Sequence, residues 1–314
     1  MNGREELKKL SPWSGEVLFD EPLAKHTSIK IGGPASALVF PTQILDLQSL
    51  ATWILKYKPN VAIFGLGSNL LTSDDGFDGV VIKTLRLATE ISLEDGGIRT
   101  GAGVSVATFL RRAASEGWDG FERISGIPGT LGGVVVMNGG THLGEAKDLL
   151  LEVRTFDLLA PEKGVRSHSG SSLAFQYRKN LFLRPSEIVV DALWRKKTGD
   201  PTTIRDLLDG LYRRRKETQP LDFPSCGSVF KNPEKGGIRA WEVVDRLGLR
   251  GHRIGNAEFS AKHPNWILNR GQASAGDVLA LIELAKTRAL SELGIELIEE
   301  VKTLSRTGGW TPTP

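Results

Sequence analysis

The chain has 314 residues, of which 40% are hydrophobic, 25% are charged and 36 are glycine, with a formal net charge of +3. This composition indicates a stable globular protein of two or three domains and excludes a disordered chain. The net charge by itself decides little, and the one compact basic run, Arg213 to Lys216, is interpreted as a solvated helix face and not as a nucleic-acid-binding stripe. No run approaches the ~18 apolar residues of a membrane span. The single cysteine, Cys226, and a charged N-terminus without the apolar core of a secretory signal predict a cytoplasmic protein with no internal disulfide.

The N-terminal part of the chain predicts short strands and one helix. Residues 1 to about 17 are expected to form a poorly ordered leader. Alternating apolar and polar residues flank a Gly-Gly-Pro turn at 32–34, which predicts strand, turn, strand. Thr42 is expected to cap a helix over 44–57, and a strand over 61–64 follows it.

This last strand ends in a glycine loop, GLGSNLL (65–71). The loop lacks the third glycine of the Rossmann fingerprint, and no helix follows it whose N-terminus could face a phosphate. Two interpretations remain open. The loop is a plain turn, or its backbone N–H groups form an anion-binding nest to which Ser68 and Asn69 add polar side chains.

A second glycine-rich stretch, SGIPGTLGGVVVMNGG (125–140), is the part around which the rest of the sequence is organised. Several glycines together indicate a backbone that takes positive φ angles or approaches a neighbour closely. The neighbour is either another strand or a flat or phosphorylated cofactor. Around this stretch we expect a helix capped by Ser105 and strands over 151–158 and 188–195, so that residues 18–197 follow an α+β pattern.

The C-terminal part of the chain begins at a polar segment near 196–201, which predicts a domain boundary. Thr203 is expected to begin a helix through a capping box. The loop PSCGSVFKNP (224–233) follows, and a long helix over 275–293 precedes a last strand over 295–304.

Six motifs follow one another along the chain: HTSIKIGG, GLGSNLLTSDDGFDGVVI, SGIPGTLGGVVVMNGG, FQYR, PSCGSVFKNP and GLRGHRIGNAEFSAKHPNWILNRGQASAGDV. Taken together and in this order, they resemble the UDP-N-acetylenolpyruvoylglucosamine reductase family, flavoenzymes that complete UDP-N-acetylmuramic acid in peptidoglycan synthesis. The resemblance runs from about residue 20 to residue 302. The short gap between FKNP and GLRG is similar to the compact type of the family, which lacks a substrate-closing insertion.

The resemblance implies an α+β fold of the vanillyl-alcohol-oxidase/PCMH type. Two FAD-binding subdomains, 18–84 and 85–197, would precede an α+β substrate-binding domain, 198–304. FAD would be held non-covalently, which leaves His26 structural, with NADPH as the reductant and a UDP-sugar as the substrate. No metal, nucleic acid, membrane or obligate protein partner is expected. The residues carried over to the cofactor are Gly65, Gly67, Ser68, Asn69, Pro128, Gly129, Thr130, Gly132, Gly133 and Asn138.

The implied reaction explains the catalytic residues. Hydride delivered from flavin N5 to the terminal carbon of an enol ether leaves a carbanion delocalised into the adjacent carboxylate, and the carbanion then takes a proton. By resemblance, Arg178 supplies the cation for the carboxylate, Ser228 supplies the proton, and Glu300 is the third catalytic residue. The family commonly reads Leu-Glu-Pro-Glu-Val where this chain has Leu-Ile-Glu-Glu-Val, which leaves a shifted register open at Glu300. Residues matched to positions near the substrate or flavin are Tyr177, Arg215, Lys231 and Asn232.

Two rival functions are compatible with a flavin site. One is a flavin oxidase of the same wider fold, which uses oxygen and a hydroxy acid or alcohol. The other is a flavin- or nucleotide-binding module without turnover. Reduction by NADPH, followed by reoxidation by the enolpyruvyl sugar nucleotide, separates the reductase from both.

Overall fold

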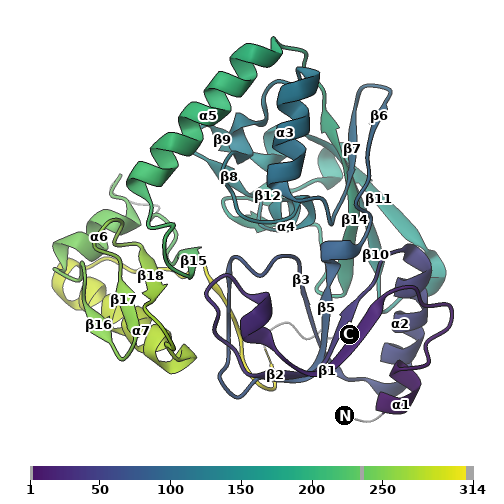
Figure 1. The fold of residues 1–314 in the computed structure, drawn as a ribbon, viewed down its shortest axis with the longest axis horizontal. Coiled ribbons are helices and arrows are strands. Elements are labelled where there is room, and N and C mark those ends of the chain that lie inside the picture. Colours follow the sequence, from purple (N-terminus) through teal and green to yellow (C-terminus); the bar gives the residue numbers. More distant parts are fainter. Residues whose placement is uncertain (1–2, 234–236, 309–314) are drawn as a thin grey trace.

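The computed structural model describes residues 3–233 and 237–308, and its fold is α+β, as predicted (Figure 1). Three main sheets follow one another along the chain, and each is built with helices close to it in sequence. Among the described residues, no helix is both long and apolar enough to cross a bilayer.

The first sheet has the strand order β1-β2-β5-β3. β1 is antiparallel to β2, whereas β2, β5 and β3 are parallel to one another, so β3 and β5 end at the same edge of the sheet. The elements of this part are α1 (Arg4–Leu7), β1 (Glu16–Pro22), a 3₁₀ turn (Leu23–His26), β2 (Pro34–Phe40), α2 (Ile44–Tyr57), β3 (Asn60–Phe64), β4 (Leu70–Thr72), β5 (Phe77–Lys83) and a 3₁₀ turn (Thr84–Arg86).

The N-terminal segment is ordered from residue 3 onward, so the prediction of a poorly ordered leader over 1–17 is wrong for the described residues. Leu7 of α1 is completely buried, and the indole N–H of Trp53 donates to the Gly3 carbonyl at 2.9 Å. Residues 1–2 lie outside the described part. The segment therefore belongs to the core of the first sheet, because α1 packs on α2.

Two helix caps also differ from the prediction. The residue before α2 is Gln43, and Thr42 instead donates its N–H and its hydroxyl to Asp46 at 2.8 and 3.0 Å. The helix expected from Thr203 begins two residues earlier, because Asp200 accepts the Thr203 N–H at 2.7 Å and a proline occupies the first turn.

The second sheet is antiparallel throughout, with the order β11-β10-β14-β7-β6, and α3 and α4 pack on one of its faces. Ser105 caps α3 by accepting the Thr108 N–H at 3.0 Å, as predicted. The elements are β6 (Ile91–Glu94), β7 (Gly97–Gly101), α3 (Val106–Glu116), a 3₁₀ turn (Phe121–Ile124), α4 (Leu131–Val136), β8 (Gly140–Thr141), β9 (Gly144–Glu145), β10 (Leu150–Asp157), β11 (Val165–Ser169), β12 (Phe175–Gln176), β13 (Lys179–Asn180) and β14 (Glu187–Arg195), with three further 3₁₀ turns (Ala146–Asp148, Pro161–Lys163, Gly170–Ser172).

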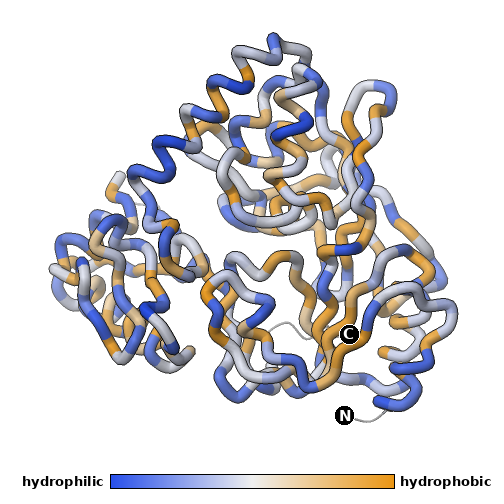
Figure 2. The backbone as a smooth tube through the Cα atoms, in the orientation of Figure 1, coloured by the Kyte–Doolittle hydropathy of each residue, from blue (hydrophilic) through white to orange (hydrophobic). Residues whose placement is uncertain are grey.

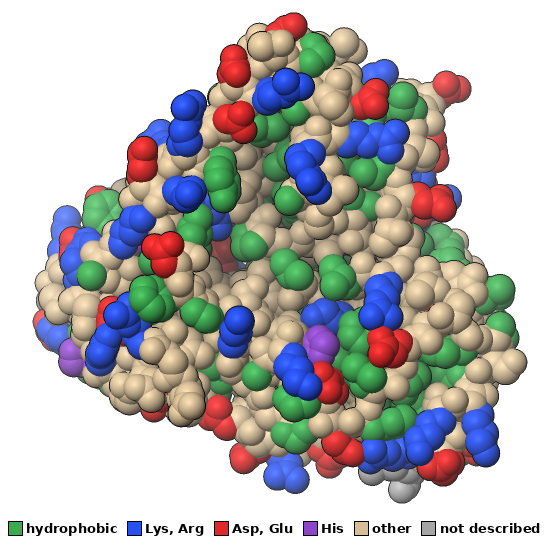
Figure 3. Space-filling view, in the orientation of Figure 1, with side chains coloured by type: hydrophobic (Ala, Val, Ile, Leu, Met, Phe, Trp, Pro, Cys, Tyr) green, Lys and Arg blue, Asp and Glu red, His purple; other side chains and the backbone are tan. Residues whose placement is uncertain are grey.

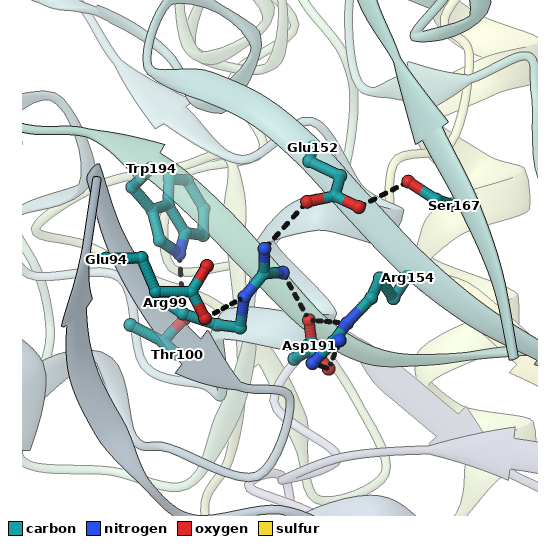
Figure 4. Close-up of polar contacts among 8 residues, drawn as sticks. All are labelled: Glu94, Arg99, Thr100, Glu152, Arg154, Ser167, Asp191 and Trp194. Carbon is teal, nitrogen blue, oxygen red and sulfur yellow. Dashed lines mark hydrogen bonds and ion pairs between the residues drawn. The ribbon is translucent and has the colours of Figure 1, made fainter. Parts of the chain in front are cut away.

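The opposite face of this sheet carries a network of ion pairs (Figure 4). Arg99 donates to Glu94, Glu152 and Asp191 at 2.7, 2.7 and 2.8 Å, and Arg154 donates to the same Asp191 at 2.8 Å. Each charge has an opposite partner. The network therefore ties neighbouring strands together and leaves no charge over for a ligand.

The third sheet has the order β15-β18-β17-β16 and packs against α6 and α7. The helix before it, α5, is hydrophilic along much of its length (Figure 2), and Ile204 is its one buried residue. The elements are α5 (Pro201–Thr218), β15 (Ser225–Ser228), α6 (Ala240–Arg246), β16 (Arg253–Ile254), β17 (Ala257–Phe259), β18 (Trp266–Asn269), α7 (Ala275–Leu293) and β19 (Lys302–Leu304).

The three parts share cores and strands. Phe156 and Ile188 of the second sheet belong to the same hydrophobic cluster as Val80 and α2 of the first part. The last strand is shorter than the expected 295–304, because only β19 forms, and it pairs in parallel with β4 of the first part. The chain thus returns to its first part after completing the third.

Candidate active site

The two glycine-rich segments predicted from the sequence face each other in the structure. The loop after β3 reaches the start of α4, where the Ser68 hydroxyl donates to the Pro128 carbonyl. A Cβ atom added to Gly65 would lie 2.6 Å from Oγ1 of Thr130. The molecular surface is hollowed where the three parts of the chain meet, with basic side chains on the rim of the hollow (Figure 3).

The loop 65–69 offers free backbone donors. Within the described part of the chain, the N–H groups of residues 66–69 donate to no other group. The first N–H groups of α4 are engaged, since Leu131 and Gly132 donate to the carbonyls of Val104 and Ala102 at 2.8 and 3.0 Å. Of the two interpretations left open, the geometry therefore fits the anion nest, and the loop provides it rather than the helix.

The glycines of the second glycine-rich stretch, 125–140, differ in how closely other protein atoms approach them. Cβ atoms added to Gly129 or Gly133 would meet no protein atom closer than 3.6 Å. A Cβ on Gly132 would lie 2.8 Å from that of Ala102, so this glycine serves packing inside the protein. Gly129 and Gly133 thus leave open surface of the kind that a flat group requires, which is the fit expected for a flavin.

Asn138 was expected to contact the cofactor, but in the structure its side chain contacts other protein groups. Its side chain is completely buried and its hydrogen-bonding groups are engaged within the protein. Nδ2 donates to Glu145 Oε2 and to the Gln176 carbonyl at 2.9 and 3.0 Å, and Oδ1 accepts the Lys147 N–H at 3.1 Å. These contacts favour a role in holding the loops together over a direct contact with a cofactor.

Arg178 lies in the turn of the β12–β13 hairpin with φ 55°, which is uncommon for a residue other than glycine. Its Nε donates to Glu300 Oε1 at 3.1 Å, and a terminal nitrogen donates to the Gly140 carbonyl at 2.8 Å. Its other terminal nitrogen lies 3.9 Å from Glu145 Oε1. Two carboxyl groups therefore flank one guanidinium, and its remaining N–H groups can donate to a third carboxyl group.

Glu300, not its neighbour, faces Arg178, although the proline of the family pattern is missing. The Glu300 N–H donates to the Val229 carbonyl at 2.8 Å, and its carbonyl accepts Nδ2 of Asn69 at 3.1 Å. Glu299 points elsewhere and pairs with Lys286 at 2.8 Å. Burial raises the pKa of the Glu300 carboxyl, and this effect outweighs the opposing effect of Arg178.

Ser228 lies at the end of β15, directly before the residue that accepts the Glu300 N–H. In residues 3–233 and 237–308 its hydroxyl has no hydrogen-bond partner, so it is available to a ligand. Cys226, two positions earlier, is buried, and burial raises the pKa of its thiol to about 12. The cysteine is therefore an unreactive packing residue.

Four residues were predicted to lie near the substrate. The Tyr177 ring lies 5.0 Å from the Arg178 guanidinium, and its hydroxyl faces the backbone N–H of Asn232. The Asn232 side chain accepts the Ala240 N–H at 3.1 Å, which braces α6. Lys231 donates its backbone N–H to Ile298 at 2.8 Å.

Arg215 of α5 packs against Gly126, where an added Cβ would lie 2.8 Å from the arginine Cδ. Within the described residues it has no carboxylate partner, and burial lowers the pKa of its guanidinium. An unpaired cation next to the glycine-rich stretch suits an anionic ligand.

Glu145 is a site residue that the sequence alone did not reveal. It follows Gly144, a few residues beyond the glycine-rich stretch that ends at Gly140, and a lone glutamate there has no motif spacing of its own. Its Oε1 is buried without a hydrogen-bond partner in the described part of the structure. The available signal was its closeness in sequence to the glycines.

A loop with free backbone N–H groups, an open glycine surface and the segments that carry Arg178, Glu300 and Ser228 together have the features of a nucleotide-cofactor enzyme. Residues 35–158 match the FAD binding domain family, and residues 219–304 match the C-terminal domain of UDP-N-acetylenolpyruvoylglucosamine reductase. The reductase of Syntrophomonas wolfei is 38% identical over 288 residues, 92% of this chain and 95% of that protein. That of Geobacter metallireducens is 39% identical over 289 residues, 92% and 94% of the two chains.

The crystal structure of UDP-N-acetylenolpyruvylglucosamine reductase (MurB) from Thermus caldophilus superimposes with a TM-score of 0.76 at 32% identity, covering 93% of this chain and 99% of that one. This chain belongs to the UDP-N-acetylenolpyruvoylglucosamine reductase family.

Proposed function

We propose that this chain is an FAD-containing oxidoreductase that uses NADPH to reduce UDP-N-acetylglucosamine enolpyruvate to UDP-N-acetylmuramate in peptidoglycan synthesis. Family membership supports the reaction. The structural observation that carries the proposal is the meeting of Arg178, Glu300 and the Ser228 segment beside the two glycine-rich segments. The cytoplasm, which supplies NADPH and UDP-sugars, is the proposed location.

The first two parts of the chain would hold FAD and the third would hold the substrate, as the divisions 18–84, 85–197 and 198–304 predict. The free N–H groups of 66–69 fit a diphosphate, and the open surface at Gly129 and Gly133 fits the ring system. Asn69 adds a link, because it also bonds the Glu300 carbonyl and accepts the Lys302 N–H at 3.0 Å. The loop 65–69 and the Glu300 carboxyl group are thus held in fixed positions relative to each other.

The chain's own residues bind the negative charge of the substrate and donate the proton. When bound and reduced by NADPH, the flavin supplies the hydride that reaches the terminal carbon of the enol ether. Arg178 binds the substrate carboxylate, into which negative charge is delocalised, and its planar fork suits two oxygens at once. Burial raises the pKa of Glu300 and so favours its neutral form, which can donate a hydrogen bond to the same carboxylate without adding charge. The Ser228 hydroxyl then gives its proton to the carbon next to the carboxylate.

The UDP-sugar brings two phosphate charges to the same hollow. Lys231 and Lys302 lie close enough to Glu300 to affect its pKa, and Arg215 lacks a carboxylate partner among the described residues. We propose that Lys231 and Arg215 bind the sugar nucleotide, with Tyr177 and Asn232 at its edge.

The direct test is anaerobic. NADPH is added to the purified yellow protein, and UDP-N-acetylglucosamine enolpyruvate follows. We expect the colour to bleach and then return, with UDP-N-acetylmuramate as the product. If the flavin stays oxidised with NADPH, while a hydroxy acid and air are turned over, the protein is an oxidase. Bound flavin without either reaction would identify a binding module.

A further inference from the structure

Lys83 is a buried cation that the reaction described above does not use. It ends β5 and is 4% exposed. Its ammonium group donates to the His26 carbonyl at 3.1 Å and to His26 Nδ1 at 3.4 Å. No carboxylate within the described residues lies within ion-pair distance of it. A buried charge without an opposite charge is unfavourable, so this arrangement calls for an explanation.

The groups around Lys83 determine which of Lys83 and His26 carries a positive charge. His26 Nε2 lies 3.1 Å from Glu21 Oε1, and Lys25 lies 3.3 Å from the same carboxyl oxygen. His26 Nε2 therefore carries the proton, and Nδ1 accepts from the lysine. Burial lowers the pKa of Lys83 to about 8, and burial also lowers that of His26. Near neutral pH the lysine is charged and the histidine is not.

The position of Lys83 relates it to the glycine loop. In the parallel pair β3–β5, Lys83 lies opposite Phe64, the residue immediately before the loop 65–69. The His26 carbonyl oxygen, which accepts the hydrogen bond from Lys83, would also lie 2.3 Å from a Cβ atom added to Gly67. Ser28 donates its N–H to the Gly67 carbonyl at 3.1 Å. One carbonyl group therefore separates the ammonium from the nest.

We propose that Lys83 is the cation of the diphosphate site, supporting the loop 65–69 from the side of the first sheet. The inference rests on the proposed function, because that function supplies the bound diphosphate. The loop amides provide direction and the lysine provides charge, and neither alone neutralises two phosphates. In the protein without ligand the lysine has no opposite charge beside it among the described residues, and the bound diphosphate would supply one.

The first test compares ligands with and without the diphosphate. Full-length protein freed of flavin is titrated with FAD, ADP and riboflavin, for the wild type and for Lys83→Met. We expect the variant to bind FAD and ADP about 10- to 100-fold more weakly, the loss expected when a nearby opposite charge is removed from a buried position, and riboflavin as before. Lys25→Met, which removes an exposed lysine from the neighbouring turn, should change none of the three. Equal binding of FAD by wild type and Lys83→Met would overturn the inference, whereas a wild type that fails to bind FAD would overturn the proposed function.

The second test separates ligand binding from a structural role. Without flavin, Lys83→Met should melt at the same temperature as the wild type or higher, because an unpaired buried charge has been removed. With saturating FAD the wild type should gain more thermal stability than the variant. A variant that loses stability without flavin and gains as much from FAD as the wild type would show that Lys83 only fastens the His26 turn.

The third test counts protons. At pH 8 about half of the Lys83 groups are charged in the free protein, and a bound diphosphate raises this share. Calorimetry in two buffers of different ionisation enthalpy should show proton uptake on FAD binding by the wild type and less by Lys83→Met. Identical uptake by the two proteins would contradict the inference.

Discussion

The guanidinium of Arg178 and the carboxyl of Glu300 are 122 positions apart in the chain and lie 3.1 Å apart in the structure. The arginine comes from a hairpin of the second part, and the glutamate comes from the segment that leads back to the first part. Because the glutamate is also fixed to Val229 of the third part, this one contact forms only when all three parts are assembled.

Replacing Arg178 by lysine tests the proposed carboxylate contact. Lysine keeps the charge but loses the planar fork. We expect reoxidation of the reduced flavin by the enolpyruvyl substrate to slow by about 100- to 1,000-fold, the usual cost of removing an oriented donor. Reduction by NADPH should change little, as stopped-flow absorbance would show. Arg184→Lys, which changes an exposed arginine that pairs with the buried Asp157 in the second part of the chain, is the matched control. Equal slowing of both half-reactions would point to misfolding.

The pH dependence tests the protonation of Glu300. Its pKa is raised in the folded protein, so the neutral form persists to higher pH than in water. As the pH rises through this pKa, the group becomes negative beside the substrate carboxylate, and KM for the substrate should increase. In Glu300→Gln this increase should disappear, because the amide cannot ionise. A profile that is the same in both proteins would mean that Glu300 does not control binding.

Glu145→Gln tests whether this half-buried carboxyl group positions Arg178. Oε1 lies 3.9 Å from the guanidinium and lacks a hydrogen bond within the described residues, so its main contribution is electrostatic. We expect a loss of about tenfold in kcat/KM for the substrate half-reaction, about 1.4 kcal/mol. The loss should be smaller when Arg178→Lys is already present, since the two residues act together. Full additivity would show that Glu145 acts independently.

Two glycine substitutions should have opposite effects on the protein without flavin. Gly133 lies in α4 with open space around it, so Gly133→Ala should stabilise that form by up to about 1 kcal/mol while weakening FAD binding. Gly67 has φ 78° and faces the His26 carbonyl, so Gly67→Ala should destabilise it by about 1–3 kcal/mol. Thermal melts of each variant with and without FAD measure both its stability and its binding of FAD. Undiminished FAD binding by Gly133→Ala would place the flavin elsewhere.

The sequence predicted the parts of the site that have local patterns. The glycine loop 65–71, the strands over 151–158 and 188–195 and the cap at Ser105 follow from spacing and composition. The helix α4 was not predicted, because glycines lower helix propensity and tertiary packing against Ala102 decides the outcome there.

Other features depend on contacts that no local pattern reveals. The parallel pairing of β19 with β4 joins segments more than two hundred residues apart. Glu145 and Lys83 are single charged residues whose importance comes from what packs around them. For Lys83 the one sequence signal was a lysine at the end of the apolar run that forms the buried strand β5 (Phe77–Lys83), where a charged residue is unusual.

The most direct measurement of the proposed reaction is a pair of half-reactions followed in Ser228→Ala. The Ser228 hydroxyl has no hydrogen-bond partner among the described residues, and the backbone pairing of β15 with β18 does not depend on that side chain, so its removal should leave the fold intact. We predict that NADPH bleaches the variant at the wild-type rate, whereas reoxidation by UDP-N-acetylglucosamine enolpyruvate is lost almost completely, because that step alone needs the proton. Reoxidation at the wild-type rate would show that the proton comes from another group and would contradict the proposed mechanism.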